Sequence, residues 1–270
     1  MIRKDFFGKN IEKLKNKSLF LLDMDGTIYR ENDLFDGVKE FLSNVENNGG
    51  KYVFITNNSS KSVDAYVQKL ANMGLKVNEE NFFTSTQASI MLLKEKFNDK
   101  PIYCQGTKSF ISELINSGVN VVQEYDPNVF AVIVGFDPEL TGEKLRNTCK
   151  TLTLHDIPYF ATNPDWVCPV DFGAVPDCGS MCFGIEKATG KKPIFIGKPE
   201  PTMITVVMQK FGAKKEDVVV IGDRIYTDIA SGFNAGVDTV LVLSGEATIE
   251  DYKNSEIKPT FVLNSVKDLL

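Results

Sequence analysis

The most informative segment of the sequence is LFLLDMDGT, residues 19–27. Its first four residues, Leu19–Leu22, form an uninterrupted apolar run, which is typical of a β-strand buried on both faces of a parallel sheet. The polar residues that follow then lie at the carboxyl end of the strand, where open α/β sheets bind their ligands. The sequence therefore predicts an α/β fold with a ligand site directly after residue 22.

The rest of the chain continues this alternation of strands and helices. Similar apolar runs predict four further strands, which we expect to join residues 19–22 in one sheet: 52–55, 194–196, 218–221 and 239–243. Apolar residues at helical spacing predict helices at 63–71 and 204–211. Residues 85–184 contain an alternation of their own. We therefore expect a parallel-sheet core formed by residues 1–84 and 185–270, and an inserted α/β domain formed by residues 85–184.

Composition narrows the class of protein. The 270 residues are 43% hydrophobic and 24% charged, as in ordinary folded proteins, and the net charge of −6 disfavours nucleic acid or an anionic membrane as the main partner. No apolar run approaches the roughly 18 residues of a membrane span, and residues 1–17 lack the apolar core of a secretory signal. The five cysteines are odd in number and scattered, which indicates reduced thiols rather than a disulfide framework. We expect a cytoplasmic protein.

Two carboxylates follow the first strand. In an extended backbone, residues two positions apart point the same way, so Asp23 and Asp25 are expected to face one site, and Gly26 allows a sharp turn after them. Like charges held so close need a cation. Mg²⁺, which favours one or two carboxylates together with water and a substrate phosphate, meets that need.

Polar residues also follow three of the other predicted strands. In chain order they are Thr56, Asn57 and Asn58, then Lys198, then Asp223 and Asp228. The first group offers a hydroxyl, amides and a helix N-terminus, which suit an anion, although capping of the helix by Ser59 or Ser60 is compatible with the same pattern. The four strand ends together indicate a site for a phosphate and a metal ion.

Four motifs resemble those of the haloacid dehalogenase superfamily, in the same order: DMDGTI at 23–28, TNN at 56–58, GKPEP at 197–201 and GDRIYTDI at 222–229. The last two motifs, with a cap domain between the second and third, are similar to the NagD-type branch that includes 4-nitrophenylphosphatases and phosphoglycolate phosphatases. Residues 162–165 and 176–180 also resemble cap and hinge segments of that branch. The resemblance covers nearly the whole chain.

The resemblance implies three catalytic residues. Asp23 would be the nucleophile and a Mg²⁺ ligand. Asp25 would be the general acid and base, and would also give its backbone carbonyl to the metal. Lys198 would pair with the transferring phosphoryl group and with Asp23. Such an arrangement suits phosphoryl transfer, which needs in-line positioning and neutralisation of oxygen charge.

The resemblance also implies the binding residues. Thr56 and Asn57, with Asn58 beside them, would hold the phosphoryl group. Asp223 would be a second direct ligand of Mg²⁺, and Asp228 would complete the metal site or orient a metal-bound water.

The sequence therefore predicts a Mg²⁺-dependent phosphatase that acts through a phospho-aspartyl enzyme, as a monomer or homodimer. The expected substrates are small phosphorylated metabolites of the sugar phosphate, phosphoglycolate or nucleotide type, with 4-nitrophenyl phosphate as a substrate in vitro. The alternatives are a phosphomutase or dehalogenase on the same fold, or a non-catalytic protein that binds phosphorylated metabolites. The single histidine, His155, excludes a His-rich zinc site, and no cysteine has an arginine within the next eight positions, as a cysteine-dependent phosphatase needs.

Overall fold

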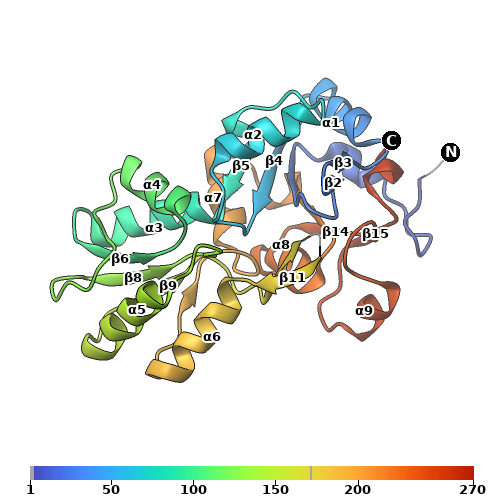
Figure 1. Ribbon diagram of the computed structural model, residues 1–270. Coiled ribbons are helices and arrows are strands. Elements are labelled where there is room, and N and C mark those ends of the chain that lie inside the picture. Colours follow the sequence, from blue (N-terminus) through green and yellow to red (C-terminus); the bar gives the residue numbers. More distant parts are fainter. Residues whose placement is uncertain (1–2, 171) are drawn as a thin grey trace. The chain divides into compact units, whose positions relative to one another are not determined.

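The computed structural model describes residues 3–170 and 172–270, and the chain divides into two compact units (Figure 1). The first unit contains the residues up to Thr56 together with residues 64–83 and 198–270. The second contains residues 57–63 and 84–197.

The first unit is built on a six-stranded sheet with the order β15-β14-β13-β1-β4-β5. Its strands are β1 (Leu19–Leu22), β4 (Lys51–Thr56), β5 (Phe82–Thr84), β13 (Val218–Gly222), β14 (Asp238–Val242) and β15 (Phe261–Leu263). The pairings from β15 through to β4 are all parallel. A short antiparallel hairpin of β2 (Tyr29–Arg30) and β3 (Asp33–Leu34) follows β1.

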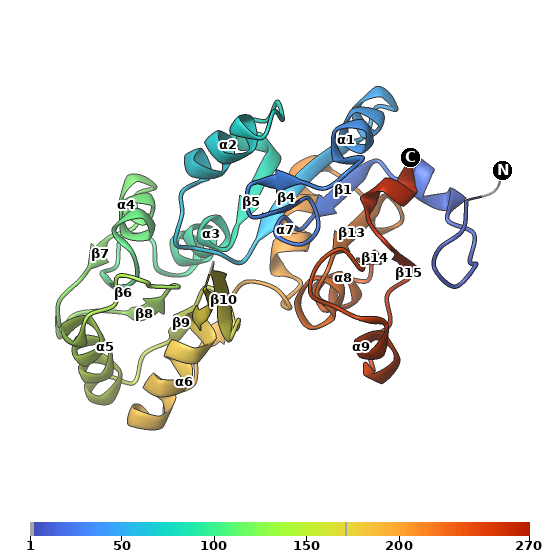
Figure 2. The same cartoon turned by 45° about the vertical axis from the view of Figure 1, so that its right-hand side comes forward.

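Helices cover both faces of this sheet. They are α1 (Val38–Asn47), α2 (Val63–Asn72), α7 (Thr202–Phe211), α8 (Ala230–Ala235) and α9 (Ile249–Asn254). The short helices are η1 (Glu12–Asn16), η2 (Glu79–Asn81), η3 (Lys215–Asp217), η5 (Val266–Leu269) and a π-helical turn, η4 (Ile225–Ile229). The chain proceeds from β1 towards one edge of the sheet and from β13 towards the other, and α1 and α2 lie on one face and α7 and α8 on the opposite face (Figure 2). This arrangement is expected when the crossover connections are right-handed.

The register of the central strands places their carboxyl ends level with one another. All four residues of β1 are buried. Its last residue, Leu22, is level with Phe54 of β4 and with Ile221 of β13. The residues that follow these three strands therefore emerge side by side at one edge of the sheet.

The second unit has its own five-stranded parallel sheet, with the order β12-β9-β8-β6-β7. The strands are β6 (Ile102–Gln105), β7 (Val121–Val122), β8 (Ala131–Val134), β9 (Tyr159–Ala161) and β12 (Ile194–Phe195). Helices α3 (Ser85–Phe97) and α4 (Lys108–Asn116) lie on one face, and α5 (Gly142–Leu154) and α6 (Cys178–Thr189) on the other (Figures 1 and 2). The strands β10 (Val167–Val170) and β11 (Gly173–Pro176) pair antiparallel.

The parallel sheets and their covering helices confirm the predicted α/β class, but one strand assignment is wrong. Residues 194–195 pair with Phe160 and Ala161 of β9 in the second unit and do not join the sheet of the first. Ile194 is 58% exposed, because this strand lies at the edge of its sheet. The second unit accordingly ends at Gly197, beyond the expected boundary at 184, and it also includes residues 57–63.

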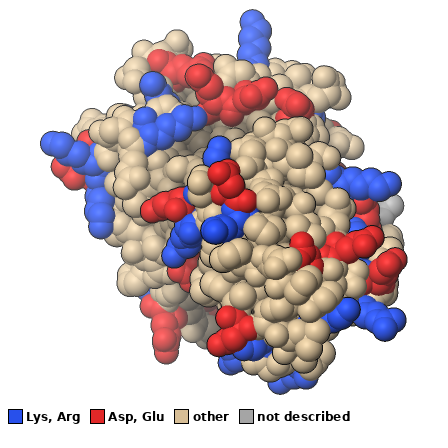
Figure 3. Space-filling view, turned by 90° about the vertical axis from the view of Figure 1, so that its left-hand side faces the viewer, with Lys and Arg blue, Asp and Glu red and all other residues tan. Residues whose placement is uncertain are grey.

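Three further observations concern the described part of the chain. None of the helices in residues 3–170 and 172–270 has the length and hydrophobicity that a membrane span requires. All five cysteines are free thiols, as expected. On the face that Figure 3 shows, basic and acidic side chains are interspersed, which is typical of a surface that keeps a protein dispersed.

Candidate active site

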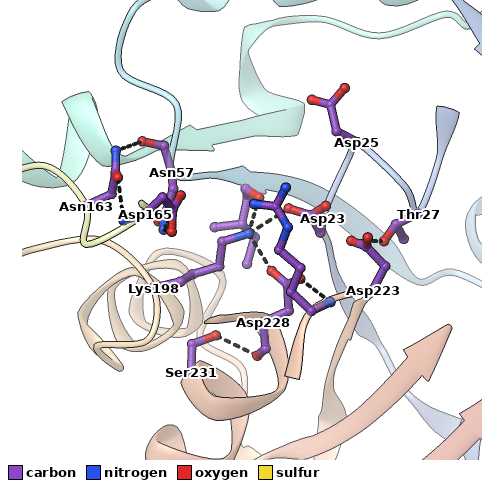
Figure 4. A network of polar contacts seen from close by, with 12 residues as sticks. Asp23, Asp25, Thr27, Asn57, Asn163, Asp165, Lys198, Asp223, Asp228 and Ser231 are labelled. Atoms are coloured by element: carbon purple, nitrogen blue, oxygen red, sulfur yellow. Dashed lines mark hydrogen bonds and ion pairs between the residues drawn. The ribbon is translucent and has the colours of Figure 1, made fainter. Parts of the chain in front are cut away.

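Three carboxylates gather at the carboxyl ends of β1 and β13 (Figure 4). Asp23 directly follows β1, and its backbone N–H donates to the carbonyl of Ile221 at 2.9 Å, which extends the strand pairing by one residue. Asp223 follows β13, and Asp228 lies on the π-helical turn after it. Each offers a carboxylate oxygen, and these atoms all lie within 4.8 Å of one another.

Lys198 lies among these carboxylates. Its Nζ donates to Oδ1 of Asp23 and to Oδ1 of Asp228, both at 2.6 Å, and to the carbonyl of Ile55 at 3.2 Å. The side chain is only 4% exposed. The lysine thus links the carboxyl end of β4 to the residues that follow β1 and β13.

The charges in this cluster shift one another's ionisation. Burial raises the pKa of Asp23 well above its usual range, and Asp228 adds to that effect, while Lys198 opposes it. Burial and then Asp228 raise the pKa of Asp223 to about 6. Burial alone would lower the pKa of Lys198, but Asp228 and Asp23 outweigh it and hold the pKa above its usual value. Three carboxylates facing one ammonium leave an excess of negative charge that a divalent cation would balance.

Asp228 and Asp223 are held differently. Both oxygens of Asp228 accept hydrogen bonds, Oδ1 from Lys198 and Oδ2 from the backbone N–H of Arg224 at 3.1 Å. Asp223 lies in a narrow space, because a Cβ added at Gly26 or at Gly245 would overlap its carboxylate. Gly26 also has a φ of +86°, which a side chain would strain.

The structure does not bring the Asp25 carboxylate to this cluster. The chain stops being extended at Met24, whose carbonyl accepts the N–H groups of Thr27 and Ile28, so the Asp25 carboxylate lies outside the cluster of the other three. The Asp25 side chain is 64% exposed, with Lys69 Nζ at 4.0 Å. Its Oδ2 accepts the hydroxyl of Tyr29 at 3.1 Å.

The segment after β4 is divided between the units. Thr56 is the buried last residue of β4, whereas Asn57 and Asn58 belong to the second unit. Asn58 Oδ1 accepts the backbone N–H and the hydroxyl of Ser60, at 2.9 and 2.7 Å. The side chain of Asn58 therefore stabilises the turn before α2. That helix begins at Val63, so neither Ser59 nor Ser60 directly precedes it as the predicted N-cap.

Two site residues escaped the sequence analysis. Arg224 and Glu246 form an ion pair, with Nε and Oε2 2.7 Å apart. The backbone N–H of Glu246 donates to Oδ2 of Asp223 at 2.7 Å. Glu246 follows the predicted strand at 239–243, so the rule that located the other residues, polar groups after a buried strand, would have found it.

Comparison with known proteins identifies the family. A family model described as haloacid dehalogenase-like hydrolase matches residues 20–120, and a second, HAD-hydrolase-like, matches residues 195–269. An acid sugar phosphatase of Staphylococcus epidermidis is 33% identical over 95% of this chain and 96% of its own length. The chain belongs to the haloacid dehalogenase-like hydrolases.

Solved structures of related phosphatases support the same family assignment. A 4-nitrophenylphosphatase from Thermotoga maritima has a TM-score of 0.90 and 39% identity, and the match covers 96% of this chain and 98% of the other. A glycerol phosphate phosphatase from Mycobacterium tuberculosis, in complex with magnesium, has a TM-score of 0.89 and 26% identity, with coverage of 95% and 77%. The predicted resemblance to the 4-nitrophenylphosphatase branch is confirmed, and this hydrolase is a phosphoric monoester hydrolase.

Proposed function

We propose that this hydrolase is a Mg²⁺-dependent phosphatase that transfers the phosphoryl group of small phosphorylated metabolites to Asp23 and then to water. The observation that carries the proposal is the cluster of Asp23, Asp223 and Asp228 around Lys198. It combines a partly buried carboxylate nucleophile, a fixed cation and further carboxylates at one strand edge, which are the parts that phosphoryl transfer requires.

The donor set fits Mg²⁺. The available groups are hard carboxylate oxygens, which magnesium prefers, and the cluster contains no thiol or imidazole. Asp23 and Asp223 would hold the ion through their side chains and Asp25 through its backbone carbonyl. Asp228, whose oxygens already accept two hydrogen bonds, would chiefly orient Lys198. When bound, Mg²⁺ would supply positive charge that neutralises the phosphoryl oxygens.

In the first step a carboxylate oxygen of Asp23 forms a bond to phosphorus, and the bond between phosphorus and the ester oxygen breaks. The leaving alkoxide takes a proton from Asp25. In the second step Asp25 accepts a proton from the attacking water, and phosphate leaves while the Asp23 carboxylate is restored. The exposure of Asp25 supports this role, because an exposed carboxyl group can reach both the leaving group and water.

Lys198 and the segment 56–58 would hold the phosphoryl group. The ammonium of Lys198 is charged and fixed by three acceptors, so its position needs no rearrangement as charge develops on the phosphoryl oxygens. Thr56, Asn57 and Asn58 would bind the same group from the end of β4.

The second unit would be the cap domain that selects the substrate. Because the related proteins include an acid sugar phosphatase and a glycerol phosphate phosphatase, we favour phosphates of sugars and small polyols, with phosphoglycolate and nucleotides as the other classes to test.

The test is phosphate release together with detection of the phospho-enzyme. The wild-type enzyme with Mg²⁺ should release phosphate from 4-nitrophenyl phosphate and from sugar phosphates, and rapid quenching with mass spectrometry should find the phosphoryl group on Asp23. Asp23→Asn should lower kcat by a factor of about 10³ or more. The control Asp36→Asn changes an exposed aspartate that pairs with Lys267, and it should leave kcat unchanged. Full turnover by Asp23→Asn would refute the covalent mechanism.

A further inference from the structure

The second unit holds Asn57 with a buried carboxylate that the proposed chemistry does not use. The Nδ2 group of Asn57 lies 3.2 Å from each carboxylate oxygen of Asp165 and donates to both (Figure 4). Asp165 is 7% exposed and Asn57 is 5% exposed. Hydrogen bonds to a charged acceptor are roughly twice as strong as those between neutral groups, so this contact orients the amide firmly.

The backbone of Asn57 is held as well. Its carbonyl accepts the hydroxyl of Ser85 at 2.6 Å and the Nδ2 group of Asn163 at 2.9 Å. Asn163 in turn accepts the backbone N–H of Asp165 through its Oδ1 at 3.0 Å. Asn57, Asn163 and Asp165 therefore form a closed ring of hydrogen bonds, which we call the Asn57 ring, and Ser85 braces it.

The Asn57 ring lies against the residue that precedes Lys198. A Cβ added at Gly197 would overlap Oδ1 of Asn57, so the glycine allows a close approach of the two segments. The backbone N–H of Gly197 donates to the carbonyl of Thr162 at 2.8 Å, which holds it in place. In the sequence, Thr56 directly precedes Asn57 and Lys198 directly follows Gly197. The ring thus holds the chain next to two residues of the proposed phosphoryl site.

We propose that Asp165 is a positioning residue for phosphoryl transfer. Its carboxylate fixes the side chain of Asn57. Through the Asn57 ring it also fixes the backbone of Asn57 and Gly197, which are the sequence neighbours of Thr56 and Lys198. A displacement of about 1 Å in such groups can cost about 10²-fold in rate. The inference rests on the proposed function, in which Thr56, Asn57 and Lys198 bind the phosphoryl group.

The decisive variant is Asp165→Asn. It keeps the shape of the side chain but removes its charge and replaces one of the two oxygens that accept from Asn57 with an N–H group, so donor faces donor at that contact. We expect kcat to fall by about 10- to 100-fold, with KM changed less than about threefold. The factor should be the same for 4-nitrophenyl phosphate and for an alkyl phosphate, because the Asn57 ring acts on the phosphoryl group and not on the leaving group.

Asp137→Asn is the matched control. Asp137 is another buried aspartate of the second unit, and its carboxylate pairs with Lys144 at 3.0 Å. This control should lower the melting temperature and leave kcat unchanged well below the melting temperature. If Asp165→Asn behaves in the same way, Asp165 is merely structural and the inference is wrong.

A double-mutant cycle tests the route through Asn57. If Asp165 acts through Asn57, the double variant Asn57→Ala with Asp165→Ala should have the kcat of Asn57→Ala alone. Additive losses would overturn the inference. Should the Asp165 variants not fold, Ser85→Ala removes one brace of the Asn57 ring and should lower kcat severalfold, and an unchanged kcat would overturn the inference. Failure of the wild-type enzyme to release phosphate would instead refute the proposed function.

Discussion

Asp23 and Asp25 are two positions apart, yet their surroundings differ sharply. The side chain of Asp23 is 16% exposed and accepts a hydrogen bond from Lys198, whereas that of Asp25 is 64% exposed and accepts one from Tyr29. The turn that begins at Met24 separates them. In the proposed mechanism the ordered carboxylate of Asp23 attacks phosphorus, and the exposed carboxylate of Asp25 exchanges protons with water.

This division of roles predicts how Asp25→Asn will behave. The variant keeps shape and hydrogen bonding but cannot exchange the proton, so turnover of an alkyl phosphate should fall by about 10²- to 10⁴-fold. 4-Nitrophenolate leaves without a proton, so with that substrate the first step should suffer less and phosphate should accumulate on Asp23. Rapid-quench mass spectrometry measures both steps.

Asp33→Asn is the control for that experiment, because Asp33 is an exposed aspartate of the neighbouring hairpin. It should leave both steps unchanged. Equal loss of phosphorylation for activated and unactivated esters in Asp25→Asn would show that Asp25 is not the acid for the leaving group.

At the scale of the elements, sequence reasoning succeeds where a strand is buried on both faces. The runs at 19–22 and 218–221 correspond to β1 and β13, and the parallel register places Asp23, Asp223 and Asp228 together at one edge. It fails at residues 194–196, because an apolar run specifies a strand but not its partner. Residues 194–195 pair with β9 in the second unit.

The remaining features of the site depend on contacts between distant segments, which the sequence pattern of one segment does not indicate. The Asn57 ring joins residues 108 positions apart, and nothing in either segment alone indicates the pairing. The direction of the Asp25 side chain depends on the turn that begins at Met24, and the apolar run before it does not specify where the extended backbone ends. The strand edge was thus predictable, and the side-chain pairing around it was not.

The turn after β14 packs tightly against the Asp223 carboxylate. Gly245 lies against Asp223, and Gly245→Ala would drive a Cβ into that carboxylate and force it to move. Changes beside a metal ligand typically cost about 10- to 100-fold in metal affinity, so the Mg²⁺ concentration needed for half-maximal activity should rise by about that factor. Measurement of activity against Mg²⁺ concentration tests this.

Gly184→Ala is the matched control for the turn. Gly184 lies within α6, and a Cβ there meets no atom within 4 Å. The control should stabilise the protein by about 0.5–1 kcal/mol, because alanine favours a helix over glycine. Its Mg²⁺ dependence should match the wild type. An unchanged Mg²⁺ dependence in Gly245→Ala would show that Asp223 does not hold the metal.

At the scale of the whole molecule, the carboxylate cluster exists only when the chain is folded. Asp23, Asp223 and Asp228 come from segments about 200 positions apart in sequence, and folding brings their like charges together. Lys198 balances only part of that charge. A cation bound there would favour the folded state, because the unfolded chain does not assemble the cluster.

Metal binding should therefore be measurable as stability, without any substrate. A Mg²⁺ concentration of about 100 times its Kd should add about 2.7 kcal/mol to the free energy of unfolding, which corresponds to a rise of about 5–10 °C in Tm for a chain of this size. Asp223→Asn should abolish the rise, whereas Asp36→Asn should retain it.

Ca²⁺ should stabilise the fold but not support phosphate release, because the larger ion tolerates a bidentate carboxylate and would occupy the attacking oxygen of Asp23. Calorimetry in EDTA, Mg²⁺ and Ca²⁺, beside phosphate-release assays, separates binding from turnover. A Tm unaffected by Mg²⁺, or full turnover in EDTA, would contradict a metal site at this cluster, and full turnover in Ca²⁺ would contradict the role given to the attacking oxygen.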